Sequence, residues 1–203
     1  MSANFTNPPE FPSCTGPDGI LYDFNYGARV LLPEGKWHVV LMDDDSGNIL
    51  FSCDSEGGWV TSNKKYYVRF RIQVFHQGEM HPVLDETLDM KDKPVVIFFP
   101  TGTLGDMLGW FHYAERFRQL HRCQLECVMG QEIIELLSAQ YPEITFSTKD
   151  NLQTVDPYAS WYVGLFFKGD TTHQPIDFRK VGFHRNAGYI LGVDPRECPP
   201  RLK

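Results

Sequence analysis

Residues 98–110 carry the side chains in this sequence that could serve a catalytic site. The segment FFPTGTLGDMLGW ends an apolar run at 95–99 and contains one carboxylate, Asp106. Gly102 and Gly105 leave backbone accessible, and N–H groups at the start of a helix attract anions. A carboxylate near a positive helix end stays ionised at neutral pH, as a general base must. The segment is neither a P-loop nor a Gly-x-Gly-x-x-Gly turn.

Asp106 also fits a structural explanation. The pattern Thr103-x-x-Asp106 matches a capping box, in which Thr103 is the N-cap and Asp106 the third helical residue. The capping role and the catalytic role are compatible, and the residues alone leave both open.

Two further groups have candidate roles. His184 and Arg185 stand near the expected start of a late helix, where they could meet phosphate or sugar hydroxyls, or simply form a solvated face. Cys123 and Cys127 lack a second cysteine pair, so we expect buried thiols and predict no metal site. The other histidines show no spacing typical of a metal site or a catalytic triad, although His112 stands near the Asp106 turn.

The elements that must position these residues change character near residue 91. Alternating apolar and polar residues at 67–75 predict a strand with one wet face. Residues 19–24 with 28–32, and 37–42 with 48–51, read as two hairpins. We therefore expect an all-β domain at 17–90, a small barrel or sandwich, after a flexible segment at 1–16.

Residues 93–193 alternate between strand and helix patterns. The apolar run at 95–99 suits a strand buried on both faces, and Leu104, Leu108, Phe111, Ala114 and Phe117 form a helical stripe after it. This alternation predicts a doubly wound α/β fold. Further strands are expected at 124–129, 144–146 and 160–167, further helices at 131–140 and 178–191, and a linker at 194–203.

Composition excludes several classes of function. The 203 residues carry 19 Lys and Arg against 26 Asp and Glu, a net charge of -7. This balance argues against nucleic-acid binding and against docking on anionic membranes. No apolar stretch is long enough for a membrane span, and no leader pattern opens the sequence. Five scattered cysteines suit reduced thiols, so a cytoplasmic location is expected.

At this point a family resemblance becomes specific. The segments that carry it are YDFN at 22–25, GARVLLP at 27–33, KKYYVRFRI at 64–72, GTLGD at 102–106 with GWF at 109–111, DFR at 177–179 and HRNAGYILGVDP at 184–195. In these segments the chain resembles the TibC-like bacterial autotransporter heptosyltransferases over nearly its whole length.

The resemblance implies a fold and an activity. Members combine an N-terminal β-barrel with a two-Rossmann glycosyltransferase, act in the cytoplasm as ring-like homo-oligomers, and transfer heptose from ADP-heptose to serines of an autotransporter passenger protein. The implied mechanism is inverting: Asp106 takes the proton of the serine hydroxyl as its oxygen attacks the anomeric carbon, and cationic groups and N–H donors stabilise the departing ADP. The implied substrate contacts are Gly102, Thr103, Leu104, Gly105, His184 and Arg185.

The resemblance covers only the first part of the family. The nucleotide-binding domain and its four-cysteine iron finger would follow Lys203, so 194–203 is expected to lead to that domain and no cofactor is expected in this chain. As a fragment it would hold the base and little of the donor site. Two alternatives stay open: a non-catalytic module for acceptor binding or oligomerisation, and a lipopolysaccharide-type heptosyltransferase, against which the β region at 17–90 argues.

Overall fold

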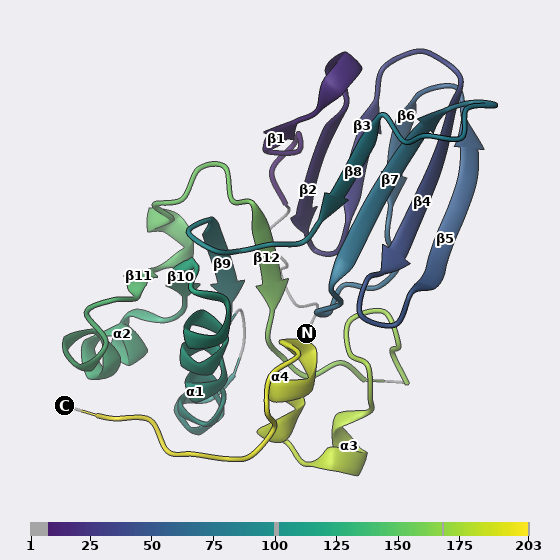
Figure 1. Ribbon diagram of the computed structural model, residues 1–203. Coiled ribbons are helices and arrows are strands. Elements are labelled where there is room, and N and C mark those ends of the chain that lie inside the picture. Colours follow the sequence, from purple (N-terminus) through teal and green to yellow (C-terminus); the bar gives the residue numbers. More distant parts are fainter. Residues whose placement is uncertain (1–7, 100–101, 168, 203) are drawn as a thin grey trace.

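The computed structural model describes residues 8–99, 102–167 and 169–202. Figure 1 shows the antiparallel strands grouped at one end of the molecule and the longest helix, with the parallel strands, at the other. The expected α/β class is confirmed: the strands form one mixed sheet and a separate antiparallel sheet.

The larger sheet is mixed and has eight strands, in the order β11-β10-β9-β12-β2-β3-β6, with β1 paired to β2. The run from β11 to β2 is parallel, and β2, β3 and β6 continue it in antiparallel fashion. Strand β2 therefore extends the sheet of the later strands, although it belongs to the first predicted hairpin. The strands are β1 (Cys14–Thr15), β2 (Leu21–Asn25), β3 (Arg29–Leu32), β6 (Gly58–Thr61), β9 (Pro94–Phe98), β10 (Gln124–Val128), β11 (Thr145–Ser147) and β12 (Ala159–Tyr162).

The smaller sheet is antiparallel, in the order β5-β4-β7-β8. Both predicted hairpins are confirmed, because β2 pairs with β3 and β4 pairs with β5. The alternation in the third predicted strand is also confirmed: Phe70, Ile72 and Val74 are fully buried, and the intervening side chains are not. The strands are β4 (Trp37–Asp43), β5 (Asn48–Ser55), β7 (Phe70–His76) and β8 (Leu84–Thr87).

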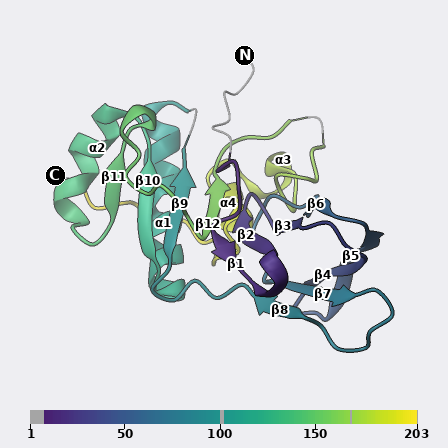
Figure 2. The ribbon, with the colours of Figure 1, turned by 90° about the horizontal axis from the view of Figure 1, so that it is seen from above.

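The helices lie mainly beside the parallel strands, as the view from above shows (Figure 2). The apolar stripe of α1 is confirmed at Phe111, Ala114 and Phe117, which are fully buried, whereas Leu104 in the first turn is 52% exposed. The single helix expected at 178–191 is wrong, since Gly182, at φ 99°, divides it into α3 and α4. The helices are α1 (Leu104–His121), α2 (Gln131–Leu137), α3 (Phe178–Val181) and α4 (Arg185–Ile190), with single 3-10 turns at Pro17–Gly19, Ser138–Gln140 and Lys149–Asn151.

The larger of two clusters of buried side chains connects the two sheets. It includes Ile72 from β7, Phe24 from β2, Phe117 from α1 and Trp161 from β12. Continuous burial of this kind makes the antiparallel sheet part of the support for the parallel strands. The carboxyl ends of β9 and β12, where open α/β sheets bind ligands, pack in the smaller cluster through Phe98 and Tyr162.

Candidate functional site

The turn between β9 and α1 holds Asp106 in a capping box. Asp106 Oδ2 accepts a hydrogen bond from the Thr103 N–H at 2.7 Å, and the Asp106 N–H donates to Thr103 Oγ1 at 3.4 Å. Both halves of the predicted capping box are thus present. The box fixes the Asp106 carboxylate within the first turn of an 18-residue helix.

The turn leaves this carboxylate open to solvent on one side. Gly102, Thr103, Leu104 and Gly105 are exposed, and Asp106 itself is half-buried. The capping box uses Oδ2, whereas Oδ1 accepts no hydrogen bond from the described residues. One oxygen is thus held and the other is available, which is the arrangement that a general base at this turn needs.

The two glycines of the turn differ in the space around them. A Cβ placed on Gly102 would lie 3.2 Å from Asp106 Cβ and 3.2 Å from Trp110 Cζ3, so this glycine lets the backbone pass close to the candidate base. A Cβ on Gly105 would meet nothing nearer than Thr103 Oγ1, at 3.8 Å. Close packing therefore explains Gly102 but not Gly105.

His184 comes to the same face of α1 as Asp106. Its ring lies against Gly109, one turn after Asp106, so closely that a Cβ there would stand 2.4 Å from His184 Cδ2. Phe183, the residue before His184, fixes this approach. The Trp110 indole N–H donates to the Phe183 carbonyl at 3.2 Å, and the Trp110 and Phe183 rings stack with their centres 5.6 Å apart. The structure thus brings together Asp106 and His184, two candidate residues that lie far apart in the sequence.

Two other candidates lie in different surroundings. Arg185 Nε forms an ion pair with Glu197 at 3.3 Å, which ties it to the C-terminal segment. His112 is 5% exposed, and both of its ring nitrogens are buried. Burial is the main cause that lowers the pKa of His112 to about 4, and the positive charge of Arg116 is the second cause. His112 is therefore a neutral core residue and not a lining residue of the turn.

A cavity of about 580 Å³ opens near the carboxyl end of β12 and was not predicted from the sequence. Its lining includes Tyr26, Arg29, Trp59, Lys65, Tyr162 and His173. Tyr26 stacks on Tyr162 with ring centres 4.6 Å apart, and Phe98, the last residue of β9, lies 5.2 Å from Tyr162. The cavity and the Asp106 turn thus share the carboxyl ends of β9 and β12.

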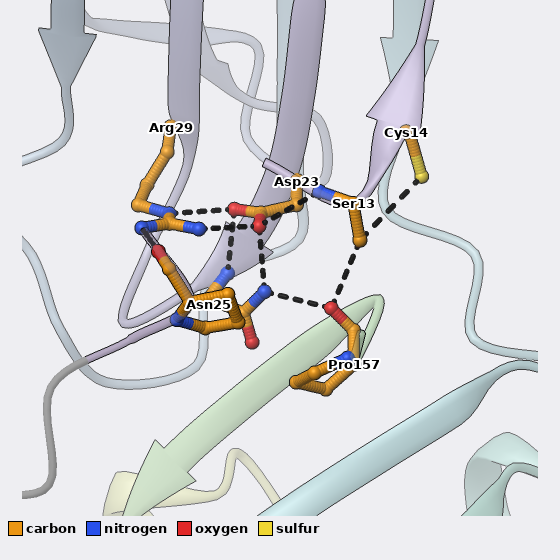
Figure 3. A network of polar contacts seen from close by, with 7 residues as sticks. Ser13, Cys14, Asp23, Asn25, Arg29 and Pro157 are labelled. Carbon is orange, nitrogen blue, oxygen red and sulfur yellow. Dashed lines mark hydrogen bonds and ion pairs between the residues drawn. The ribbon is translucent and has the colours of Figure 1, made fainter. Parts of the chain in front are cut away.

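Asn25 and Arg29, which line the cavity, belong to a buried polar network (Figure 3). Arg29 Nη2 lies 2.5 Å from Asp23 Oδ2, and both side chains are almost wholly buried. The Asn25 amide donates to Asp23 at 2.6 Å and to the Pro157 carbonyl at 2.7 Å, which ties β2 to the loop before β12. Arg29 also donates to the Pro9 carbonyl at 2.9 Å.

A serine, a histidine and an aspartate meet on the smaller sheet, although spacing along the chain did not indicate it. Ser52 Oγ lies 3.1 Å from His38 Nε2, and His38 Nδ1 lies 2.6 Å from Asp54 Oδ1. The β4–β5 register places His38 opposite Asp54. The His38 and Asp54 side chains are 40% and 62% exposed, so water competes for each bond and cross-strand pairing is the role we assign.

The cysteines match the expectation of buried thiols. Cys123 and Cys127 are buried and unpaired, and burial raises the pKa of Cys123 to about 12. Among residues 8–99, 102–167 and 169–202, no group of three or more His, Cys, Asp or Glu side chains is arranged to hold a metal ion. In the part of the chain that the structure describes, none of the helices has both the length and the apolarity to cross a bilayer.

Comparison with known proteins gives a consistent result. A family described as "Glycosyltransferase TibC, N-terminal domain" matches residues 16–78. The autotransporter heptosyltransferase TibC of Escherichia coli O78:H11 is 70% identical over 198 residues, which are 98% of this chain and 49% of that protein. The heptosyltransferase BAHTCr of Citrobacter rodentium is 69% identical over 202 residues, 100% of this chain and 49% of its own. The chain thus spans about half the length of the curated relatives it matches.

A more distant relative differs in activity. BimC of Burkholderia thailandensis, an inactive autotransporter heptosyltransferase, is 42% identical over 201 residues, 98% of this chain and 47% of that protein.

Two solved structures match the fold. The crystal structure of the iron-containing dodecameric glycosyltransferase TibC from enterotoxigenic E. coli superposes with a TM-score of 0.96 at 69% identity, covering 98% of this chain and 52% of that one. Dodecameric TibC in complex with ADP-D-beta-D-heptose superposes with a TM-score of 0.95 at 68% identity, with the same coverage.

Proposed function

We propose, from the relationship of this chain to the N-terminal half of the TibC-like autotransporter heptosyltransferases, that it is the acceptor-side half of a protein O-heptosyltransferase. The reaction would transfer heptose from ADP-heptose to serine hydroxyls of an autotransporter passenger protein. The ADP-heptose complex of TibC supports this donor, and the names of the relatives support this acceptor.

The proposed chemistry is an inverting displacement with Asp106 as general base. The free Asp106 Oδ1 would take the proton of the serine hydroxyl while the serine oxygen bonds to the anomeric carbon and the bond to ADP breaks. The observation that carries this assignment is the capping box, which holds Oδ2 and leaves Oδ1 available at the carboxyl end of β9.

The neighbouring groups would act on substrates rather than on the proton. The exposed backbone of Gly102, Thr103, Leu104 and Gly105 offers polar contacts at the positive end of α1. His184, packed on Gly109, would contact substrate beside the base, and Arg185 would contribute positive charge from the start of α4. A wall that binds ADP must come from residues outside these elements, because a donor cleft needs two sides.

The remaining assignments follow the same relationship. Residues 17–90 would form the family's barrel, 93–193 the first Rossmann-like half, and 194–203 the connection to a nucleotide-binding domain. The protein would act in the cytoplasm as a homo-oligomer, as the dodecameric form of TibC suggests. Iron would be held outside this chain, since Cys123 and Cys127 are buried and the pKa of each thiol is raised by burial.

The test is a chimera in which this chain replaces the matching half of E. coli TibC. We expect the chimera to transfer heptose from ADP-heptose to a serine-bearing acceptor. Asp106→Asn should reduce transfer about 100-fold or more, the usual contribution of a general base, without unfolding the protein. Transfer by the Asp106→Asn chimera at the unsubstituted rate would refute the base assignment.

The second candidate function is a non-catalytic module that binds acceptor or assembles oligomers. The relationship to inactive BimC favours keeping it in view. The same chimera separates the two, because a non-catalytic half would fail to restore transfer while the chain still folds. A lipid-core acceptor in place of the peptide tests the lipopolysaccharide-type alternative.

A further inference from the structure

We propose that the 580 Å³ cavity beside β12 binds the acceptor polypeptide next to the modified serine, and that Lys65 pairs there with an acidic side chain of the acceptor. This inference rests on the proposed function, which makes a polypeptide the acceptor. It adds a binding subsite and a preference for acidic sequence that the transfer reaction alone does not require.

The position of the cavity is the first argument. Its lining residues Tyr26 and Tyr162 lie in one aromatic cluster with Phe98, at ring distances of 6.2 and 5.2 Å from Phe98. Phe98 is the last residue of β9, and the turn that carries Asp106 follows it. A polypeptide whose serine reached Asp106 would therefore run along the same sheet edge as the cavity.

The charge of the lining is the second argument. Lys65 Nζ donates to the Ser62 carbonyl at 2.7 Å and forms no ion pair with a carboxylate of the described residues, although the exposed Glu10 lines the same cavity. Burial is the main cause that lowers the pKa of Lys65, and the positive charge of Arg29 is the second cause. Arg29, in contrast, is neutralised by Asp23. A half-buried ammonium without a carboxylate partner is a site that an acidic side chain of a ligand would complete.

The edge strand β6 is the third argument. Among the described strands β6 pairs with β3 alone and ends the order of the larger sheet. Trp59 and Thr61 face the cavity, whereas Val60 between them is buried in the core. An extended polypeptide can lie along such an edge, with its side chains alternating into the cavity.

Part of the cavity lining is formed before any ligand arrives. Arg29, Asn25 and Pro9 all line the cavity, and the network with Asp23 and Pro157 holds them (Figure 3). A ligand would therefore lose little free energy in ordering the site. Trp59 is the exception: it is 47% exposed, with the Arg29 guanidinium 5.5 Å from its ring centre.

Trp59 also supplies the readout for a test. The chain has four tryptophans, and the other three, Trp37, Trp110 and Trp161, are buried. Acrylamide quenching therefore reports mainly on Trp59. The probes are blocked peptides with one central serine in a glycine, threonine and asparagine background. A single aspartate occupies each other position in turn, and a peptide without aspartate serves as reference.

We expect at least one aspartate peptide to protect Trp59 from quenching and to bind about tenfold more tightly than the reference peptide. Lys65→Met should abolish that preference. Lys64→Met is the matched control and should retain it, because Lys64 lies over the Tyr66 ring and not in the cavity lining. Trp59→Phe should remove the fluorescence response, and circular dichroism checks that each variant is folded.

Two results would overturn the inference: no peptide protects Trp59, or Lys65→Met keeps the preference for aspartate. Neither result depends on transfer activity. An active chimera whose isolated chain binds no peptide would refute the subsite alone. Peptide binding by a chain whose chimera is inactive would refute the proposed enzyme while leaving the subsite intact.

Discussion

At the scale of single residues, the two carboxylate oxygens of Asp106 differ in their contacts. Oδ2 closes the capping box with the Thr103 N–H, and this bond holds the carboxylate at a fixed angle to α1. Oδ1 accepts no hydrogen bond from the described residues, and it is Oδ2 that lies near Gly102. The observed cap and the proposed base therefore use different oxygens of one carboxylate, which is why the sequence pattern suited both roles.

Gly109 decides whether His184 can reach this arrangement. A Cβ at Gly109 would lie 2.4 Å from His184 Cδ2, so Gly109→Ala must displace the ring. We expect a loss of about 1–3 kcal/mol in the free energy of unfolding, despite alanine's better helix propensity, together with reduced transfer in the chimera. Urea unfolding and the transfer assay measure the two effects.

Gly105→Ala is the matched control for this substitution. Its Cβ would approach nothing nearer than 3.8 Å, so its stability should stay level or rise by up to about 1 kcal/mol. If Gly109→Ala were as stable as Gly105→Ala, the close packing of His184 on α1 would have no consequence for stability.

At the scale of elements, the buried network around Asp23 joins the first hairpin to β12. Asp23 accepts from Arg29 and from Asn25, and Asn25 reaches the Pro157 carbonyl just before β12. Asp23→Asn would leave the buried Arg29 charge unpaired, and we expect a loss of about 3–5 kcal/mol in the free energy of unfolding. Chemical denaturation of the 203-residue chain measures it.

Asp85→Asn provides the comparison, because it breaks the Arg71–Asp85 pair on the outer face of the smaller sheet. That pair has a similar distance, 2.7 Å, but its side chains are 36% and 33% exposed. Water replaces the lost contact there, so the expected loss is at most about 1 kcal/mol. Equal losses for Asp23→Asn and Asp85→Asn would show that burial of the Asp23 network does not matter for stability.

Local sequence patterns predicted where the strands lie better than they predicted which strands pair. Alternation identified β7, the polar turn after Asp43 identified the β4–β5 hairpin, and the apolar run before Pro100 identified β9. Each of these signals lies within a few neighbouring residues. The pairing of β2 with β12 depends on residues more than 130 positions apart, such as Asn25 and Ser160, and no local signal carries it.

The same limit applies to the candidate site. Asp106 was identified because its turn and cap lie in one short segment. Trp59, Lys65 and Tyr162 meet only through sheet order, so their cavity was invisible in the sequence. The single late helix was expected from its apolar residues, but Gly182 adopts a positive φ and ends α3 there. The β-branched and aromatic residues before it did not indicate this break.

At the scale of the whole molecule, we expect two histidines, the buried His112 and the half-buried His121, to make stability depend on pH. Burial lowers the pKa of His112 and of His121 to about 4, and both lie on α1. His121 packs between the Tyr67 and Phe117 rings, at 5.2 and 4.4 Å. Protonating His112 in the folded chain would place a charge in the core, and protonating His121 would place one between two aromatic rings.

The direction follows from the two pKa values. An unfolded histidine titrates near pH 6.5, so between about pH 6.5 and about pH 4 the unfolded chain binds protons that the folded chain does not. The free energy of unfolding should therefore fall as the pH is lowered through this window, by up to about 3 kcal/mol for the buried His112. Paired carboxylates such as Asp194, whose pKa Arg196 holds at about 2, lose their contribution at lower pH.

Urea unfolding at intervals between about pH 7 and about pH 5 would measure this loss while most carboxylates stay ionised. His112→Gln removes the titrating group and should flatten the dependence, and His121→Gln should flatten it further. His81→Gln is the control, because His81 is exposed and its replacement should leave the slope unchanged. If the free energy of unfolding kept its pH dependence in the His112→Gln and His121→Gln variants, the acid sensitivity of the fold would arise outside α1.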